Sequence, residues 1–208
     1  MHVNKPRGFT LIELVVGIVV FSIALMLFTS LIVPQAVRSV DSIFQVRATE
    51  LAQSLINEIV SKPFDENSNR TGGTARCNED LSVPSDGDTL DISIGEVGDC
   101  TASNLLGEDG VAEGGLRGTY NDVDDYHGLD ESDGAIRSSL GGFITIDNVN
   151  LYQGFQAQVT VFYDDNRNGI DDAIDNGMIV NNNTKLITIT ITTPNNEEIN
   201  FSTYRSNY

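Results

Sequence analysis

The longest apolar run in the chain lies close to its N-terminus, where Leu14 to Val33 contains no charged residue and no proline. In an α-helix such a run rises about 30 Å, the thickness of the hydrocarbon core of a bilayer. Lys5 and Arg7 precede it, and positive charge on this side predicts a cytoplasmic N-terminus. A cleaved secretory signal has a shorter apolar core of about 7–15 residues, so we expect a membrane-spanning helix over 14–33.

An ionisable residue, Glu13, stands at the very start of this run. A carboxylate at membrane depth costs roughly 2.5–3.5 kcal/mol on insertion scales. A permanent single-pass anchor explains the rest of the run but not Glu13. Alternatively, Glu13 has no function, and its side chain simply extends to the lipid headgroups. We therefore expect Glu13 to serve a purpose that a simple anchor does not have.

The stretch KPRGFTLIELVVGIVV, residues 5–20, resembles the leader and mature N-terminus of type IV pilins and of type II secretion pseudopilins. The resemblance combines a basic flank, a small residue, and Phe, Thr and Glu ahead of a full-length apolar run. In that family a dedicated peptidase cuts after the glycine, and the new N-terminal residue is methylated. The resemblance thus implies cleavage after Gly8 and N-methylation of Phe9.

The same resemblance implies that mature subunits leave the inner membrane and bundle their N-terminal helices into an extracellular filament. Glu13 would then face the N-terminal amine of a neighbouring Phe9. Such a pair favours the correct register, because an unpaired buried charge costs several kcal/mol. The implied partners are other pilin subunits, the prepilin peptidase, the inner-membrane assembly platform and, before assembly, the membrane itself.

Three further stretches resemble the minor pilins of mannose-sensitive haemagglutinin (MSHA) type pili. They are QVRATELAQSLINEI at 45–59, NDVDDYHG at 121–128 and the C-terminal residues 189–208. The resemblance implies a minor structural subunit that acts in pilus assembly or surface adhesion. Two alternatives stay open, namely a minor pseudopilin of a type II secretion system and a membrane-tethered calcium-binding module that does not polymerise.

The segment 121–128 has no role that its residues alone reveal. We expect a solvated acidic loop, with a second cation site through Asp122, Asp124 and Asp125 as the alternative.

Beyond Pro34 the composition becomes that of an amphipathic helix, which we expect to end near Val60 because Pro63 follows. Pro34 itself predicts a kink, since it removes one backbone donor. Apolar residues recur at three- and four-residue steps and should face a sheet. They are Val37, Val40, Phe44, Ala48, Leu51, Leu55 and Ile59.

Four C-terminal stretches alternate apolar and polar residues over strand lengths: GGFITIDNV, GFQAQVTVFYDD, TKLITITITTP and EEINFSTYRS. The turn residues PNNE predict a hairpin between the last two. The expected fold class is α+β and pilin-like, with a long N-terminal helix, transmembrane and then amphipathic, packed on a C-terminal antiparallel β-sheet. We expect a leader at 1–8, the helix at 9–62 and a head at 63–208, loop-rich over 64–140 and sheet over 141–205.

The two cysteines, Cys77 and Cys100, lie in the loop-rich region and lack the CxxC spacing of redox or zinc motifs. The expected topology places both in an oxidising compartment. We therefore predict a disulfide between them, which would stabilise the head by roughly 3 kcal/mol through loop closure. Two free thiols are the alternative.

The stretch DDNRNGIDDAID, residues 164–175, fits the pattern D-x-[DN]-x-[DN]-G-x5-E of EF-hand loops, with Asp175 in place of the final Glu. The predicted ligands are the side chains of Asp164, Asn166, Asn168, Asp172 and Asp175 and the carbonyl of Ile170. The flanking residues indicate strand rather than helix, so we expect a weak Ca2+ loop between two strands, with a Kd near 10⁻⁴–10⁻³ M. An Asn-Gly hairpin loop with solvated acids is the alternative.

Charge and motifs argue against other classes. The net charge of −18 argues against nucleic acid as a partner, because phosphate binding needs clustered lysine and arginine. The histidines are His2 and His127, and the sequence contains no nucleophile elbow, P-loop or HExxH motif. We therefore expect no catalytic residue, no catalytic cofactor and no enzyme.

Overall fold

The computed structural model describes residues 8, 10–68, 76–77, 100–110, 116–132, 134–175 and 182–207, with the side chains of 33–40 also outside the description. The chain divides into two compact units, Met1–Phe44 and Gln45–Tyr208.

The first unit is built from the N-terminal part of helix α1, which runs over Leu11–Ser61. Within it, Leu11–Ile32 is 22 residues long with a mean hydropathy of 2.8, long and apolar enough to cross a membrane. None of this segment is buried, and it begins before the predicted run, so that it includes Glu13. The helix continues through Pro34 without interruption, and the kink stays a prediction.

Hydroxyl groups inside the apolar segment are satisfied by their own helix. Ser22 Oγ donates to the Ile18 carbonyl, and Thr29 Oγ1 lies 3.0 Å from both the Leu25 and the Met26 carbonyls. Such back-bonding suits a helix in a medium without water, where an unsatisfied polar group costs several kcal/mol.

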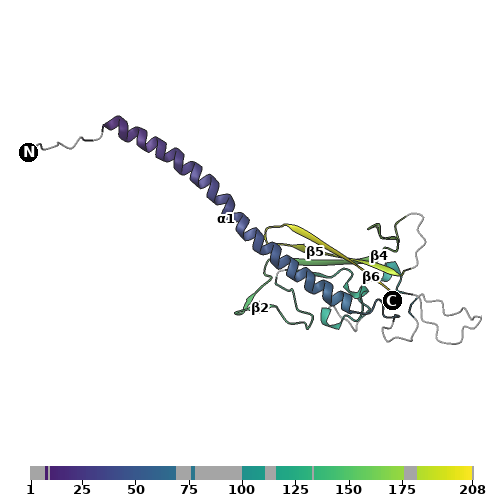
Figure 1. Ribbon diagram of the computed structural model, residues 1–208. Coiled ribbons are helices and arrows are strands. Elements are labelled where there is room, and N and C mark those ends of the chain that lie inside the picture. The colour runs from purple at the N-terminus through teal and green to yellow at the C-terminus, as the bar shows by residue number, and fades with distance from the viewer. Residues whose placement is uncertain are drawn as a thin grey trace, which may run out of the picture. The chain divides into compact units, whose positions relative to one another are not determined.

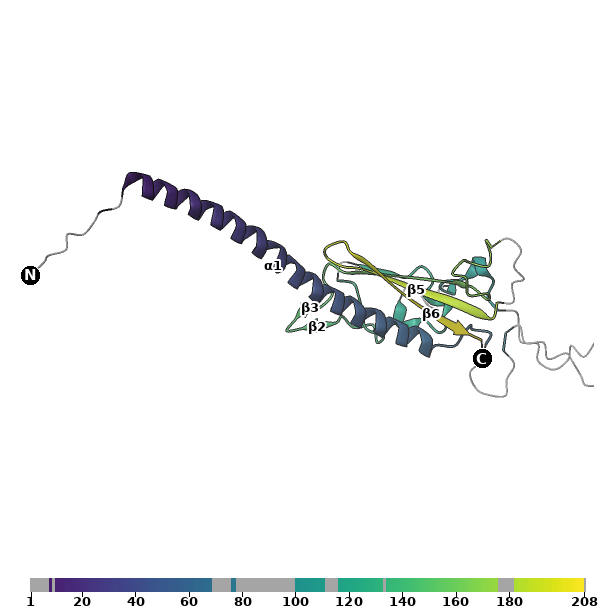
Figure 2. The same ribbon diagram turned by 45° about the horizontal axis from the view of Figure 1, so that its top comes forward.

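In the second unit, the C-terminal part of α1 supplies one layer and a four-stranded sheet the other. Figures 1 and 2 show this part of the helix running along the sheet. Four residues of the predicted stripe are buried, and Ala52 joins them: the full set is Ala48, Leu51, Ala52, Leu55 and Ile59. Val37 and Val40 lie among the side chains outside the description. The helix ends at Ser61, two residues before Pro63, and the predicted α+β fold is confirmed.

The main sheet has the strand order β1-β4-β5-β6 and is antiparallel throughout. Its strands are β1 Asp130–Ser132, β4 Gln156–Tyr163, β5 Thr184–Thr192 and β6 Glu198–Ser206. The last three follow the predicted stretches, and the predicted hairpin joins β5 to β6. Alternate residues are buried along β4 and, from Ile187 onward, along β5, so that one face of the sheet covers the core. The first three residues of β5, Thr184–Leu186, are all buried.

The prediction that GGFITIDNV forms a strand of this sheet is wrong. The segment folds back on itself as a separate two-stranded hairpin of β2 Thr145–Ile146 and β3 Val149–Asn150. Asp147 and Asn148 between them have φ values of 51° and 64°, the left-handed conformation that two-residue hairpin turns require. The fourth strand of the main sheet is instead β1, from the region predicted to be loop-rich.

The described part of the loop-rich region 64–140 contains short 3-10 helices: η1 Ser103–Leu105, η3 Arg117–Thr119 and η4 Asp124–Tyr126. Arg117 is buried, with its Nε 3.2 Å from Glu58 of α1 and its Nη1 2.8 Å from Glu131 of β1. The Tyr126 hydroxyl also donates to Glu58, at 2.9 Å. A buried arginine between two carboxylates therefore joins the helix to the edge of the sheet.

Candidate functional site

The predicted processing site lies just ahead of α1. Gly8 is exposed, and a Cβ atom added there would meet nothing within 4 Å. Phe9, the predicted methylated residue, lies outside the described residues. The fold therefore does not require glycine at position 8. Any requirement for glycine there has to come from a partner protein that binds this residue.

Glu13 occupies the third position of the helix, and Thr10 caps it. The backbone N–H of Glu13 donates to Thr10 Oγ1 at 3.3 Å, the contact of a capping box. A carboxylate in the first turn also interacts favourably with the positive end of the helix dipole. Sequence reasoning missed Thr10, although the spacing T-L-I-E was a signal for it. The Glu13 carboxylate has no hydrogen bond or ion pair with any described residue.

The predicted disulfide between Cys77 and Cys100 is present, which confirms the pairing. Its surroundings are more apolar than the loop-rich sequence suggests, because both sulfurs pack with Phe64, Tyr163 and Leu106 in a small core. Asp65 also lies within 4.8 Å of the two sulfurs. Sulfurs joined in a disulfide are not thiolates, so this group is no metal site.

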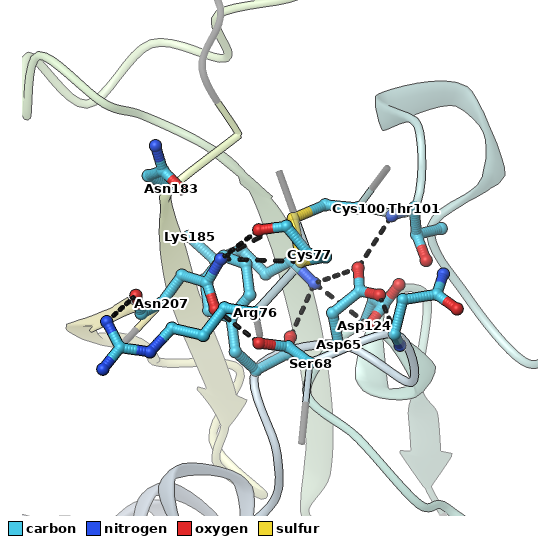
Figure 3. The surroundings of a disulfide bond; sticks show 12 residues. Asp65, Ser68, Arg76, Cys77, Cys100, Thr101, Asp124, Asn183, Lys185 and Asn207 are labelled. Carbon is cyan, nitrogen blue, oxygen red and sulfur yellow. Dashed lines mark hydrogen bonds and ion pairs between the residues drawn. A yellow bond between two sulfur atoms is a disulfide. The ribbon is translucent and has the colours of Figure 1, made fainter. Parts of the chain in front are cut away.

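A buried lysine lies beside the disulfide, between the two aspartates Asp65 and Asp124 (Figure 3). Lys185 Nζ is 3.0 Å from Asp124 Oδ1 and 3.5 Å from Asp65 Oδ2, and both Lys185 and Asp65 are fully buried. The ammonium also donates to the Phe64 carbonyl and lies over the rings of Phe64 and Tyr163. These contacts join β5, the residues that follow α1 and the segment 121–128.

The expectation that 121–128 forms a solvated acidic loop is wrong. Asp122, Asp124 and Asp125 are all buried. Asp125 Oδ2 accepts from the backbone N–H groups of Asn121 and Asp122, and Asp122 Oδ1 accepts from that of Asp124. The segment folds around its own carboxylates, and the cation that it holds is the Lys185 ammonium, a part of the same chain.

His127, at the end of that segment, is exposed, and its Nδ1 lies 2.6 Å from the Val161 carbonyl of β4. The imidazole therefore contacts the backbone of the sheet.

The loop 164–175 leaves the end of β4 and lies before β5, as predicted. Asp164 is fully buried: its Oδ1 accepts from Asn168 N–H, and its Oδ2 accepts from Gly169 N–H and the Tyr204 hydroxyl. Gly169 has a φ of 81°, which suits the sharp turn expected at this position. Burial and the nearby carboxylates raise the pKa of Asp172.

Residues 3–29 match a family model described as the prokaryotic N-terminal methylation motif. The chain carries a prepilin-type N-terminus. The match covers Gly8, Phe9 and Glu13, and it indicates a type IV pilin-like or pseudopilin-like protein that is processed by a prepilin peptidase. No curated protein and no solved structure matches the chain.

The prepilin-type motif together with the apolar helix fits a precursor that is anchored in the inner membrane and later enters a filament. It implies contact with other pilin subunits and with the prepilin peptidase, and it indicates a structural rather than a catalytic protein.

Oxidation of the cysteines can be tested by alkylation. In denaturant without reductant we expect no label on the exported protein, and two labels after reduction, since both sulfurs are in one bond. Replacing both cysteines with serine should lower the free energy of unfolding by about 3 kcal/mol. Two labels without reductant would contradict the disulfide.

Proposed function

We propose that the protein is a minor subunit of a type IV pilus of the MSHA type, similar to the minor pilin D of such pili. In this proposal the leader is removed after Gly8, Phe9 is methylated, and α1 carries the subunit into the filament core. The prepilin-type motif supports the processing steps. The resemblance of three separate stretches, at 45–59, 121–128 and 189–208, supports the MSHA type.

The observation that best supports assembly into filaments is the Glu13 carboxylate, which is unpaired among the described residues. It lies in an apolar segment of 22 residues. The large apolar side chains of this segment are exposed, so lipid covers them before assembly and neighbouring helices after it. The neighbouring subunit's N-terminal amine would supply the charge that Glu13 lacks.

Glu13→Ala is expected to insert into the membrane normally and to be lost from filaments. Without the Glu13 carboxylate, the N-terminal amine of a neighbouring subunit would be unpaired, at a cost of about 3 kcal/mol. This cost corresponds to a reduction in incorporation of about 100-fold. Quantitative mass spectrometry of sheared filaments from cells that express both wild type and variant measures the ratio.

The matched control is Thr29→Ala, which removes a polar group from the same segment whose hydroxyl is already bonded to its own helix. It should enter filaments as wild type does. Equal incorporation of Glu13→Ala and wild type would refute the ion-pair mechanism.

Intact mass spectrometry of sheared surface filaments separates this proposal from the alternatives. A chain that begins at methylated Phe9 in that fraction supports the pilin. A processed chain found in the cell envelope alone supports a secretion pseudopilin, and an unprocessed chain in the membrane supports a tether that does not polymerise.

A further inference from the structure

We infer that the loop 164–175 binds one calcium ion and that Asp172 is the ligand that the fold holds ready for it. The inference is independent of the proposed function, because it rests on contacts within the second unit alone.

Asp172 carries an oxygen atom that nothing satisfies within the part of the chain that the structure describes. Only 3% of the residue is exposed. Its Oδ2 accepts from the backbone N–H of Asp165, at 2.8 Å, but its Oδ1 is buried without a hydrogen-bond partner. Buried carboxylate oxygens are normally satisfied, and leaving one without a partner costs about 1–3 kcal/mol or more.

The orphaned oxygen belongs to a carboxylate held inside the loop. The backbone N–H of Asp172 donates to the carbonyl of Tyr163, the last residue of β4, while its side chain reaches Asp165 at the start of the loop. The charges of Asp164, Asp165 and Asp175 all act on it. Asp172 is therefore held at the start of the loop and largely withdrawn from solvent.

The other predicted ligands in the loop keep lone pairs that a cation could use. Asp164 accepts three hydrogen bonds, of which one goes to Oδ1, so this oxygen keeps a lone pair for a cation. The side-chain amides of Asn166 and Asn168 both reach Asp175 Oδ2, at 3.3 and 2.8 Å. Asn166, Asn168 and Asp175, at positions 3, 5 and 12 of the loop, thus meet at one point. A cation bound there would favour the rotated amides, in which the side-chain oxygens of Asn166 and Asn168 point toward it and the nitrogens point away.

Charge and ligand chemistry favour calcium. The loop contains five aspartates against a single arginine, Arg167, whose guanidinium lies 5.8 Å from the ring centre of Tyr204. All the available ligands are oxygens in an irregular loop, which suits the flexible coordination of Ca2+ better than the strict octahedron of Mg2+. A two-residue Asn-Gly turn does not fit, because residues 164–183 lie between β4 and β5.

The site is also joined to the sheet. The Tyr204 hydroxyl of β6 donates to Asp164 Oδ2, and the backbone N–H of Asn183 donates to Asp165 Oδ1. Calcium bound in the loop should therefore stabilise this end of β5 and β6 by mass action, and not the loop alone.

The test uses the full-length chain in detergent, titrated with CaCl2 by calorimetry and melted with calcium or with chelator. We expect one ion per chain with a Kd of about 10⁻⁴–10⁻³ M, and an 11-fold rise in the folding equilibrium constant at calcium ten times Kd. The Tm should rise by a few degrees, and equimolar MgCl2 should have a smaller effect.

Two variants and a matched control make the test specific. Asp172→Asn should abolish the calcium response while leaving the calcium-free Tm unchanged or higher, because it removes the buried charge but keeps the shape. Asp175→Asn should weaken binding at least 10-fold. Asp171→Asn makes the same charge change in the same loop at a residue outside the ligand set, whose Oδ1 accepts from Ala173 N–H, and it should change Kd by less than 3-fold.

Absence of saturable binding up to 10 times the expected Kd would overturn the inference. A calcium response that survives in Asp172→Asn would also overturn it. An equal reduction in all three variants would do the same, because diffuse charge screening, and not a specific site, would then explain the response.

Discussion

Replacing Gly8 with glutamate is expected to leave the leader on the chain and to exclude the protein from filaments altogether. The fold gives no reason for this effect, because a side chain at Gly8 meets nothing within 4 Å. The block would therefore come from the peptidase, whose site accepts a small residue before the cut. Intact mass spectrometry of the membrane fraction should find the eight leader residues retained.

Gly8→Ala is the control for this experiment. Alanine is small, and open space surrounds the position, so processing should continue. A mature N-terminus at Phe9 in Gly8→Glu would show that the leader is misidentified, whatever the fate of the filament.

The second large effect is expected at Lys185. Lys185→Met should lower the free energy of unfolding by about 3–5 kcal/mol, because it leaves Asp65 and Asp124 buried beside each other without their shared cation. Urea denaturation of the full-length chain in detergent, with the disulfide intact, measures the difference. Stability within 1 kcal/mol of wild type would mean that the carboxylates do not depend on Lys185.

Asp122→Asn is the matched control, since it alters a buried acid in the same group. Burial and a hydrogen bond with Asp124 raise the pKa of Asp122 to about 9, from its ordinary value of 3.8. The Asp122 side chain is then neutral at pH 7, and because asparagine is also neutral and has the same shape, the substitution should change stability little at that pH.

The same raised pKa predicts how stability depends on pH. Because the folded state binds the Asp122 proton more tightly than the unfolded state, wild-type stability should fall as pH rises from about 4 to 9. Asp122→Asn should flatten that decline.

Residue spacing was sufficient to predict α1 and the three long strands. Alternation defined β4, β5 and β6, and Pro63 marked the end of α1 to within one residue. The failure at 141–149 came from treating alternation as decisive when Asp147 and Asn148 offered a turn in the middle of the stretch. Strand β1 has an acidic sequence with low strand propensity, and it pairs with β4 because tertiary contacts hold it there.

The buried charges could have been found in part. Lys185 is in phase with Ile187, Ile189 and Ile191, so the alternation of β5 already placed its side chain on the core face. A lysine there needs buried acids, and the segment 121–128 offered them. Arg117 gave no such signal, because its surroundings have no periodicity, and its partners Glu58 and Glu131 come from distant parts of the chain.

Asn207, one residue before the end of the chain, is part of the core around the disulfide. It is buried, its amide donates to the Cys77 carbonyl, and its Oδ1 accepts from Ser68 (Figure 3). The choice of a labelling site follows from this. We expect an epitope inserted next to Asn207 to disturb the packing beside the disulfide. The exposed turn at Asp147 and Asn148 should accept an insertion and still present it to an antibody.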